Sequence, residues 1–148
     1  KKETLLTSDN NTGTIEETAK KVIKKLHRNI IKKIDALEKD FDDKKLHKIR
    51  ISLKKLRYLL EEFQHIFGEK KIEKMIEKGK KLQTLLGDFN DTVNQTKLLH
   101  NYFASNKNIS DSEALEHQLL DQTAKSQNKL MLQAKKKLHK FKEKALKL

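Results

Sequence analysis

The sequence predicts an all-α fold, an antiparallel four-helix bundle with long helices, from its composition, its hydrophobic periodicity and its length. The chain has no proline, no tryptophan and only 4 glycines among 148 residues, and Lys, Leu, Glu, Ile and Gln supply helix-forming residues almost throughout. The hydrophobic residues, 35% of the total, recur mainly at three- and four-residue steps, which gives each helix one narrow apolar face. Four long helices would use the whole chain, and short connections between them imply antiparallel neighbours.

The first element is a polar leader that precedes a long helix. Residues 1–13 combine turn-forming residues with two leucines, so we expect a flexible leader before a single domain over residues 14–148. Thr14 and Glu17 have the spacing of a capping box, which predicts a helix that begins there and ends near Lys39. Its apolar residues recur at helical intervals: Ile15, Ala19, Val22, Leu26, Ile30, Ile34 and Leu37.

A second helix is predicted from Asp42 or Asp43, either of which can cap it, to Gly68. Gly68 can end the helix by adopting the left-handed conformation. Between these limits the apolar residues form a seven-residue repeat without a gap: Leu46, Ile49, Leu53, Leu56, Leu60, Phe63 and Phe67.

The third predicted helix spans residues 70–103 and contains Gly79 and Gly87. Each internal glycine costs about 1 kcal/mol relative to alanine, so we expect a close contact at each one. The apolar face of this helix comprises Ile72, Met75, Leu82, Leu86, Phe89 and Val93.

The fourth predicted helix follows a loop over residues 104–110 and runs to the C-terminus. Ser110 and Glu113 form a second capping box at its start. The apolar residues that follow repeat at three- and four-residue steps: Leu120, Ala124, Met131, Ala134, Leu138, Phe141, Ala145 and Leu148.

The charge balance indicates a polyanionic partner. Lys and Arg number 34 against 21 Asp and Glu, which gives a formal net charge of +13, and such an excess repels itself unless anions offset it. The absence of cysteine excludes disulfides and thiolate chemistry and agrees with a reducing compartment. No apolar run reaches the roughly 18 residues of a membrane span, and no signal segment opens the chain. We therefore expect a cytoplasmic protein, and the start at Lys1 is compatible with a fragment of a longer chain.

Enzymatic activity is not expected. A narrow apolar face on each helix suits a bundle rather than an enzyme with a deep pocket. The sequence contains no P-loop, glycine-rich fingerprint or nucleophile motif, so it predicts no catalytic residue and no cofactor. Glu62 and His65 form a single Glu-x-x-His element, whereas a carboxylate-bridged metal site in a bundle needs paired elements, so no metal is predicted.

Four basic residues on the second predicted helix form the candidate binding site. His47, Arg50, Lys54 and Arg57 recur at steps of three and four, so they line one ridge beside the apolar face. We call these four residues the cationic stripe. Stacked like charges destabilise a helix by a few tenths of a kcal/mol per pair, so a counter-charge is expected there. Forked arginine donors, a compact lysine charge and a histidine that donates from either nitrogen suit a phosphate ligand, although a solvated charged face remains the alternative.

Two segments carry a resemblance to a known family. Residues 46–58 and 82–91 resemble the CHAD (conserved histidine α-helical domain) family, whose pattern is H-x-x-R-x-x-x-K-x-x-R-Y followed by L-Q-x-L-L-G-x-x-N-D. The matching positions are His47, Arg50, Lys54, Arg57, Tyr58, Gln83, Gly87, Asn90 and Asp91. The resemblance implies a non-enzymatic helical domain that binds inorganic polyphosphate on a basic surface. It also implies association with polyphosphate granules.

The resemblance covers one half of such a protein. Family members contain two four-helix bundles in about twice this length, and residues 15–148 resemble the C-terminal half of that CHAD-type double bundle. The basic surface of the family lies between the two bundles. A missing N-terminal half-domain or a homodimer would therefore complete the surface, or a single bundle binds more weakly.

Supporting contacts to the anion are expected from all four helices, and sulfate or phosphate is expected to bind there in crystals. The residues share a basic or polar side chain beside an apolar face or beside the stripe: Lys24, Arg28, Lys55, Tyr58, Lys80, Lys81, Gln83, Asn90, Lys135, His139 and Lys142.

Two other functions compete with polyphosphate binding. The same charge would bind the phosphates of RNA or DNA with steep salt dependence, but aromatic residues make up only 5% of the chain and most phenylalanines fall on predicted apolar faces. A helical scaffold or a protein of the membrane surface is the third class, and its apolar stripes would be consumed by the bundle.

Overall fold

The structure, a computed structural model, describes residues 12–106, 112–144 and 146. Each element within these ranges is a helix, so the predicted all-α class is confirmed. Five helices follow one another: α2 (Thr12–Lys39), α3 (Asp43–Glu62), α4 (Gln64–Phe67), α5 (Glu69–Ser105) and α6 (Ser112–Glu143).

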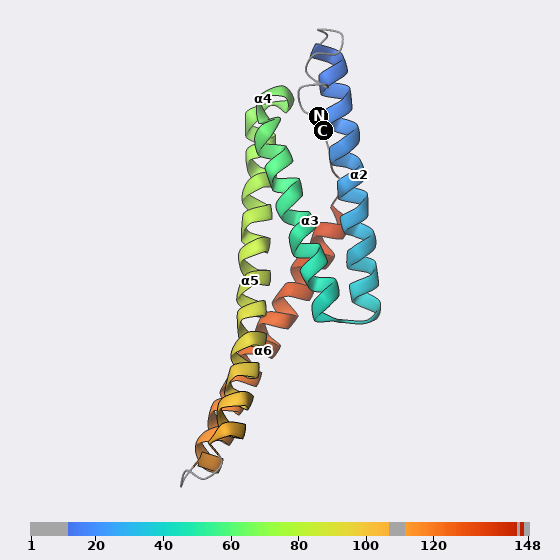
Figure 1. The fold of residues 1–148 in the computed structure, drawn as a ribbon. Coiled ribbons are helices and arrows are strands. Elements are labelled where there is room, and N and C mark those ends of the chain that lie inside the picture. The colour runs from blue at the N-terminus through green and yellow to red at the C-terminus, as the bar shows by residue number, and fades with distance from the viewer. Residues whose placement is uncertain (1–11, 107–111, 145, 147–148) are drawn as a thin grey trace.

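The four long helices run alternately up and down (Figure 1). A short loop joins α2 to α3, α5 lies along α3, and α6 returns along α5. The contact between α2 and α6 is much less extensive than the contacts between the other neighbouring long helices. The helices therefore do not form an evenly closed bundle of the kind that the sequence predicts.

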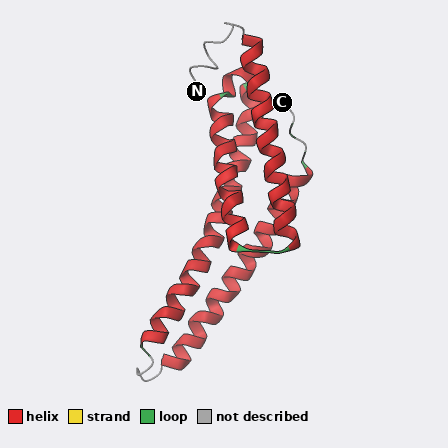
Figure 2. Ribbon diagram, turned by 45° about the vertical axis from the view of Figure 1, so that its right-hand side comes forward, coloured by secondary structure: helices red, strands yellow, loops and turns green. Residues whose placement is uncertain are grey.

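The lower parts of α5 and α6 continue beyond the α2–α3 loop as a helix pair, which we call the α5–α6 arm (Figure 2). The arm comprises residues 94–105 of α5 and 112–129 of α6. Phe103 is the one buried hydrophobic residue that the structure describes in these two stretches. Thr96 Oγ1 donates a hydrogen bond to Gln127 Oε1 at 3.2 Å across the pair.

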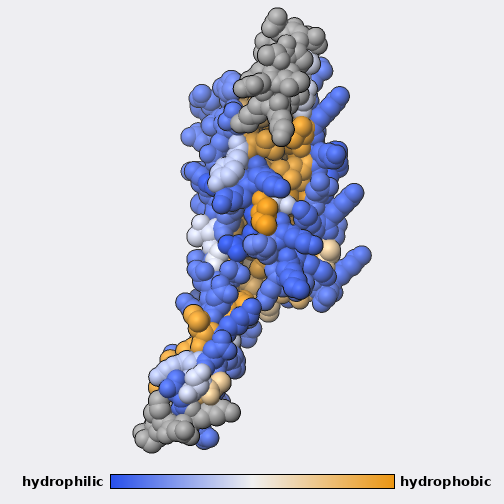
Figure 3. All heavy atoms as spheres, in the orientation of Figure 1, coloured by the Kyte–Doolittle hydropathy of each residue, from blue (hydrophilic) through white to orange (hydrophobic). Residues whose placement is uncertain are grey.

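The hydrophobic core lies where α2, α3, α5 and the second half of α6 meet. Its fully buried members include Ile30, Ile49, Leu86, Phe89 and Leu138. Hydrophilic side chains cover most of the face that Figure 3 shows, and apolar side chains are visible in its upper part.

Two predicted core positions are replaced by their neighbours. Val22 is 45% exposed, and Ile23 is fully buried in its place. Both positions follow Ala19 by about one helical turn, so periodicity alone does not choose between them. On α5, Ile76 is buried and Met75 is partly buried against the core. On α6, Ala124 is exposed because it lies on the arm, where α2 and α3 are absent.

The predicted helix starts are partly wrong. Thr14 does not cap α2, because the helix begins two residues earlier and the Thr14 carbonyl accepts a hydrogen bond from Thr18 Oγ1 at 2.8 Å. Asp42 occupies the cap position of α3, where its carbonyl accepts from the Leu46 N–H at 3.0 Å, but its side chain makes no capping hydrogen bond. The second capping residue, Ser110, lies outside the described residues.

The second predicted helix is interrupted at Phe63. Its φ of −105° and ψ of 15° depart from helical values, so α3 ends at Glu62 and the single turn α4 follows. The seven-residue apolar repeat continues through Phe63, so the periodicity did not predict an interruption of the helix there. Gly68 has the expected positive φ of 89°, but its ψ of 117° lies outside the left-handed helical region.

The fourth predicted helix is shorter than expected. Helix α6 ends at Glu143 rather than at the C-terminus, and the predicted apolar positions Ala145 and Leu148 lie outside the described residues. Among the helices in the described ranges, none is long and apolar enough to cross a membrane.

Candidate functional site

Helix α3 places the cationic stripe directly beside the core. Leu46, Ile49, Leu53 and Leu56 are buried, and each residue of the stripe follows one of them in the sequence. His47 and Lys54 are exposed, whereas Arg50 and Arg57 are half-buried. The apolar stems of the arginines therefore lie against the protein, and the two exposed residues lie at the surface between and beside them.

Tyr58 joins the upper end of the stripe. The Lys54 Nζ atom lies 6.0 Å from the centroid of the Tyr58 ring, and the Arg57 Cζ atom lies 5.0 Å from it. Tyr58 is 52% exposed, so its ring holds these two cations at the surface rather than in the core.

Few acidic groups neutralise the stripe. Arg57 Nε lies 3.7 Å from Glu61 Oε1, one turn away on the same helix, which is too long for a hydrogen bond. The buried Nε atom has no hydrogen-bond partner among the described residues. No ion pair joins His47, Arg50 or Lys54 to an acid in the part of the chain that the structure describes.

Helix α5 presents the second motif to the stripe. A Cβ atom at Gly87 would lie 3.8 Å from Arg50 Nη2, so the guanidinium of Arg50 rests on the surface of α5 at this glycine. Gln83, one turn earlier, is half-buried, and its Oε1 atom has no hydrogen-bond partner within the described ranges. Asn90 is half-buried as well. The two sequence motifs therefore meet where α3 packs on α5.

The expected tight contacts at the internal glycines are absent. The 3.8 Å separation at Gly87 is an ordinary van der Waals distance, so an alanine would fit there. At Gly79, no heavy atom of the described residues lies within 4 Å of the position that a Cβ would take. The prediction of a close intramolecular contact is therefore wrong at Gly79.

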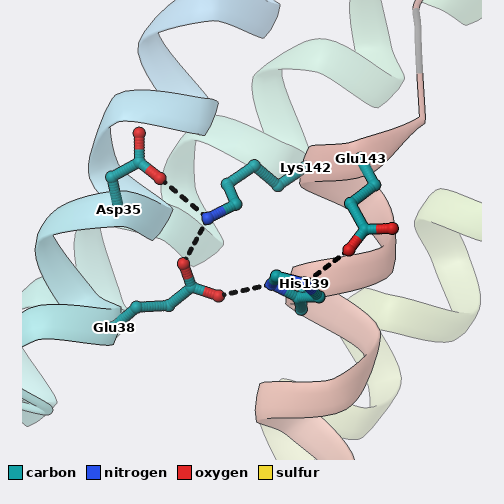
Figure 4. A network of polar contacts seen from close by, with 5 residues as sticks. All are labelled: Asp35, Glu38, His139, Lys142 and Glu143. Carbon is teal, nitrogen blue, oxygen red and sulfur yellow. Dashed lines mark hydrogen bonds and ion pairs between the residues drawn. The ribbon is translucent and has the colours of Figure 1, made fainter.

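The candidate residues of α6 face α2 and the loop that follows it. Lys142 forms ion pairs with Asp35, at 3.0 Å, and with Glu38, and His139 Nδ1 lies 2.9 Å from Glu38 Oε2 (Figure 4). His139 Nε2 also contacts Glu143. We call these five residues the α2–α6 network. Acids of the same chain therefore pair with two of the three α6 residues that the sequence offered as supporting contacts, His139 and Lys142.

The network shifts the pKa of its members. Hydrogen bonds from Lys142 and His139 lower the pKa of Glu38. The hydrogen bond with Glu38 and the charge of Glu143 raise the pKa of His139. Hydrogen bonds with Glu38 and Asp35 raise the pKa of Lys142. Each shift favours the charged form, as expected for opposite charges in contact.

The remaining candidates are dispersed. Lys135 Nζ lies 5.2 Å from the centroid of the Phe41 ring, at the α2–α3 loop. The others are exposed on three helices, namely Lys24 and Arg28 on α2, Lys55 on α3, and Lys80 and Lys81 on α5. Lys81 and Arg57 both line a groove between α3, α5 and α6.

Sequence reasoning missed the acidic half of the α2–α6 network. Asp35 and Glu38 stand three residues apart and so share one face of α2, which was the available signal. Their partners lie about a hundred residues away, and periodicity within a helix does not say which helix it faces. Within the described ranges, no group of three or more His, Asp or Glu residues is placed to hold a metal ion.

The fold and the site define an all-helical domain in which a cationic helix face adjoins a polar helix face. The family model of the CHAD domain matches residues 2–100, which include α2, α3, α4, both motifs and most of α5. The chain therefore belongs to the CHAD domain family. No curated protein sequence and no solved structure is significantly similar to it.

Proposed function

We propose that this chain binds inorganic polyphosphate along the cationic stripe and catalyses no reaction. Membership of the CHAD family is consistent with this role. The observation that carries the proposal is the lack of neutralisation on α3, where His47, Arg50 and Lys54 have no acidic partner in the described part of the chain. The two half-buried arginines have planar donor groups that can each contact two phosphate oxygens, and Lys54 adds a point charge between them.

The spacing of the stripe suits a linear polyanion. Residues 47 to 57 span about 15 Å at 1.5 Å per residue, so one extended chain of phosphates can contact successive turns of α3. Gln83 and Asn90 lie on the adjoining face of α5, where their amide groups can donate to phosphate oxygens at the edge of the stripe. The ring of His47 can also donate a hydrogen bond to a phosphate oxygen at the end of the stripe.

Nucleic acid is the competing ligand. Tyr58 is exposed beside Lys54 and Arg57, but a sequence-tolerant platform for single strands stacks successive bases on several aromatic rings. A single tyrosine in the stripe favours a ligand without bases.

The proposal includes the assignment of this chain to one half of a CHAD-type double bundle in the cytoplasm, associated with polyphosphate granules. The motif forms Arg57-Tyr58 and Asn90-Asp91 support the C-terminal half. A second copy or an N-terminal half-domain would then cover the stripe. Light scattering with and without polyphosphate distinguishes a dimer formed around the ligand from a monomer that binds alone.

Titration with long-chain polyphosphate tests the function. We expect the H47A/R50A/K54A/R57A variant to lose at least about a hundredfold in affinity, since each hydrogen bond to a charged group contributes about 1.5–3 kcal/mol. A variant lacking three lysines of the arm, K97A/K125A/K129A, removes the same three formal charges, since histidine counts as neutral, and controls for long-range attraction. Equal affinities of the two variants would refute the stripe as the site. Competition against RNA and DNA at equal phosphate concentration follows, and a preference for RNA would refute polyphosphate as the ligand.

A further inference from the structure

A large groove opens between α3, α5 and α6, close to the α4 end of the molecule. Its volume is about 1080 Å³, and its floor is apolar. Leu56 and Leu60 of α3, Leu82 and Leu85 of α5, and Phe141 of α6 contribute to that floor. His27 of α2 closes one side, with its ring centroid 5.2 Å from that of Phe141. Burial lowers the pKa of His27, so this side of the groove is neutral at physiological pH.

Lysines form both rims of the groove. Helix α5 supplies Lys70, Lys71, Lys74, Lys78 and Lys81. The opposite rim consists of Lys137, Lys140 and Lys144, at the end of α6 and directly after it. No acidic residue is among the described residues that line the groove. We call this site the lysine-rimmed groove.

The two rims approach each other without a counter-charge between them. The contact with the Lys144 side chain, together with its positive charge, lowers the pKa of Lys78. Like charges across a gap repel each other, so an anionic group placed between the rims would be stabilised by both. A ligand that is apolar on one side and anionic at its edges would therefore be complementary to the floor and the rims of the groove.

At Gly79 the backbone of α5 is exposed to the groove because the residue has no side chain. This glycine lines the groove, and nothing in the described structure lies within 4 Å of the position that a Cβ would take. A helix with glycine at an internal position is less stable than one with alanine, and no contact among the described residues accounts for the glycine here. A ligand that approaches the α5 backbone closely would account for it.

The distribution of the lysines distinguishes between ligands. A fatty acid or another single-headed amphiphile carries its charge at one end, whereas these rims carry charge along their length. Residues 70 to 81 of α5 span about 16 Å at 1.5 Å per residue, which equals about three helical turns. Polyphosphate has charge along its length but no apolar surface to cover the floor.

We propose that the lysine-rimmed groove binds an acidic amphipathic helix of a partner protein, about three turns long. Its apolar face packs on Leu82, Leu85 and Phe141, and its acidic flanks pair with the rows of lysines on α5 and α6. This mode follows the general pattern of a helix in a groove, with apolar anchors at i, i+3, i+4 and i+7. Arg57 of the stripe also lines the groove, whereas His47, Arg50 and Lys54 do not, so the inference does not depend on polyphosphate binding.

A synthetic peptide tests the proposal. The peptide has leucines at i, i+3, i+4 and i+7 and glutamates on both flanks, and its binding to the full chain is followed by fluorescence anisotropy. We expect binding that Gly79→Leu abolishes, because the new side chain occupies the groove. K74E/K78E should weaken binding at least about tenfold by replacing attraction with repulsion at the rim. The matched charge reversal on the arm, K97E/K129E, should change the affinity less than about twofold.

A folding check, a milder variant and a neutral peptide serve as controls for this experiment. Circular dichroism checks that Gly79→Leu remains helical, and Gly79→Ala provides a milder variant that should raise the melting temperature while it weakens peptide binding. Equal binding by Gly79→Leu and the wild type would overturn the proposal. Equal binding of a peptide with glutamine in place of glutamate would overturn the role of the rims.

Polyphosphate and phosphatidylglycerol vesicles test two other possible ligands of the groove. Polyphosphate added to the peptide complex should displace little peptide, and full displacement would make the groove a part of the polyanion site instead. Phosphatidylglycerol vesicles that bind the wild type but not Gly79→Leu, with no peptide binding, would assign the groove to a membrane surface. The variant H47A/R50A/K54A leaves Arg57 of the groove in place. Loss of polyphosphate binding in this variant with peptide binding retained would show that the two functions are independent.

Discussion

The cationic stripe of α3 and the pair His139 and Lys142 of α6 contain similar side chains, but within the described residues acids pair closely with the α6 residues and only loosely with the stripe. His139 and Lys142 pair with Asp35, Glu38 and Glu143, so their charges hold α2 and α6 together. The stripe faces outward beside the polar side of α5, with one loosely placed glutamate. A basic helix face can thus serve as a contact between helices or as a binding surface. Acidic residues on the neighbouring helix determine which of the two it is.

The largest expected difference between the two regions is in affinity for polyphosphate. Arg50→Ala should weaken binding at least about tenfold, because a hydrogen bond to a charged group contributes about 1.5–3 kcal/mol. Lys142→Ala removes the same formal charge but should change the affinity less than about threefold, because its charge is already neutralised. Isothermal titration at a fixed salt concentration measures both. Similar losses in the two variants would show that net charge, rather than position, governs binding.

The second prediction concerns a variant that frees the basic residues of the α2–α6 network to bind the anion. The variant D35N/E38Q removes the two acids of α2 that hold His139 and Lys142. We expect the affinity for polyphosphate to rise about threefold, since two freed cations attract the ligand through a screened, solvent-exposed field. The variant D43N/E73Q removes two exposed acids outside the network and serves as the control. An equal gain in the control would attribute the effect to net charge alone.

The smallest expected effect is the dependence of stability on pH. The raised pKa of His139 adds stability that is complete below its ordinary value of 6.5 and is lost as the pH rises through the raised value. The lowered pKa of Glu38 adds stability that is complete above its ordinary value of 4.5 and is lost as the pH falls through the lowered value. The network is therefore strongest between pH 4.5 and 6.5.

Urea unfolding of the wild type and of His139→Ala measures this effect. The two midpoints should differ more at about pH 5.5 than at an alkaline pH above the raised pKa of His139, where the ring is neutral in the folded and the unfolded state. His47→Ala, which changes a histidine outside the network, should show no such dependence. A difference between wild type and His139→Ala that is the same at both pH values would contradict the role of His139 as a charged link.

The elements of the fold were largely predictable because their signals are local. Periodic apolar residues located the four long helices, and the scarcity of glycine and proline left few possible breaks. The interruption at Phe63 was not predictable, because Phe63 and Phe67 keep the apolar repeat in phase across it. The exposure of Ala124 was not predictable either, because it depends on where α2 and α3 end relative to α6.

The site was predictable along one helix and not between helices. Steps of three and four placed the residues of the stripe on one face of α3, and the structure has them there. The contact between Arg50 and Gly87 and the ion pairs of Lys142 join residues far apart in the sequence. A single sequence contains no measure of such pairings, so it could not show that acids of α2 pair with His139 and Lys142, which it offered as supporting contacts to the anion.

The α5–α6 arm is expected to unfold locally while the rest of the protein stays folded. Each helix of the arm has one neighbour, and Phe103 is its single buried hydrophobic side chain in the described residues, with Leu98, Tyr102 and Leu115 at least half exposed. Local opening there disrupts little buried surface, so its free energy lies well below that of global unfolding. Amide hydrogens of residues 94–105 and 113–129 should exchange with solvent through this partial opening, while those around Ile49 and Leu86 should exchange only when the whole chain unfolds. The protein thus behaves as two cooperative units built on the same pair of continuous helices.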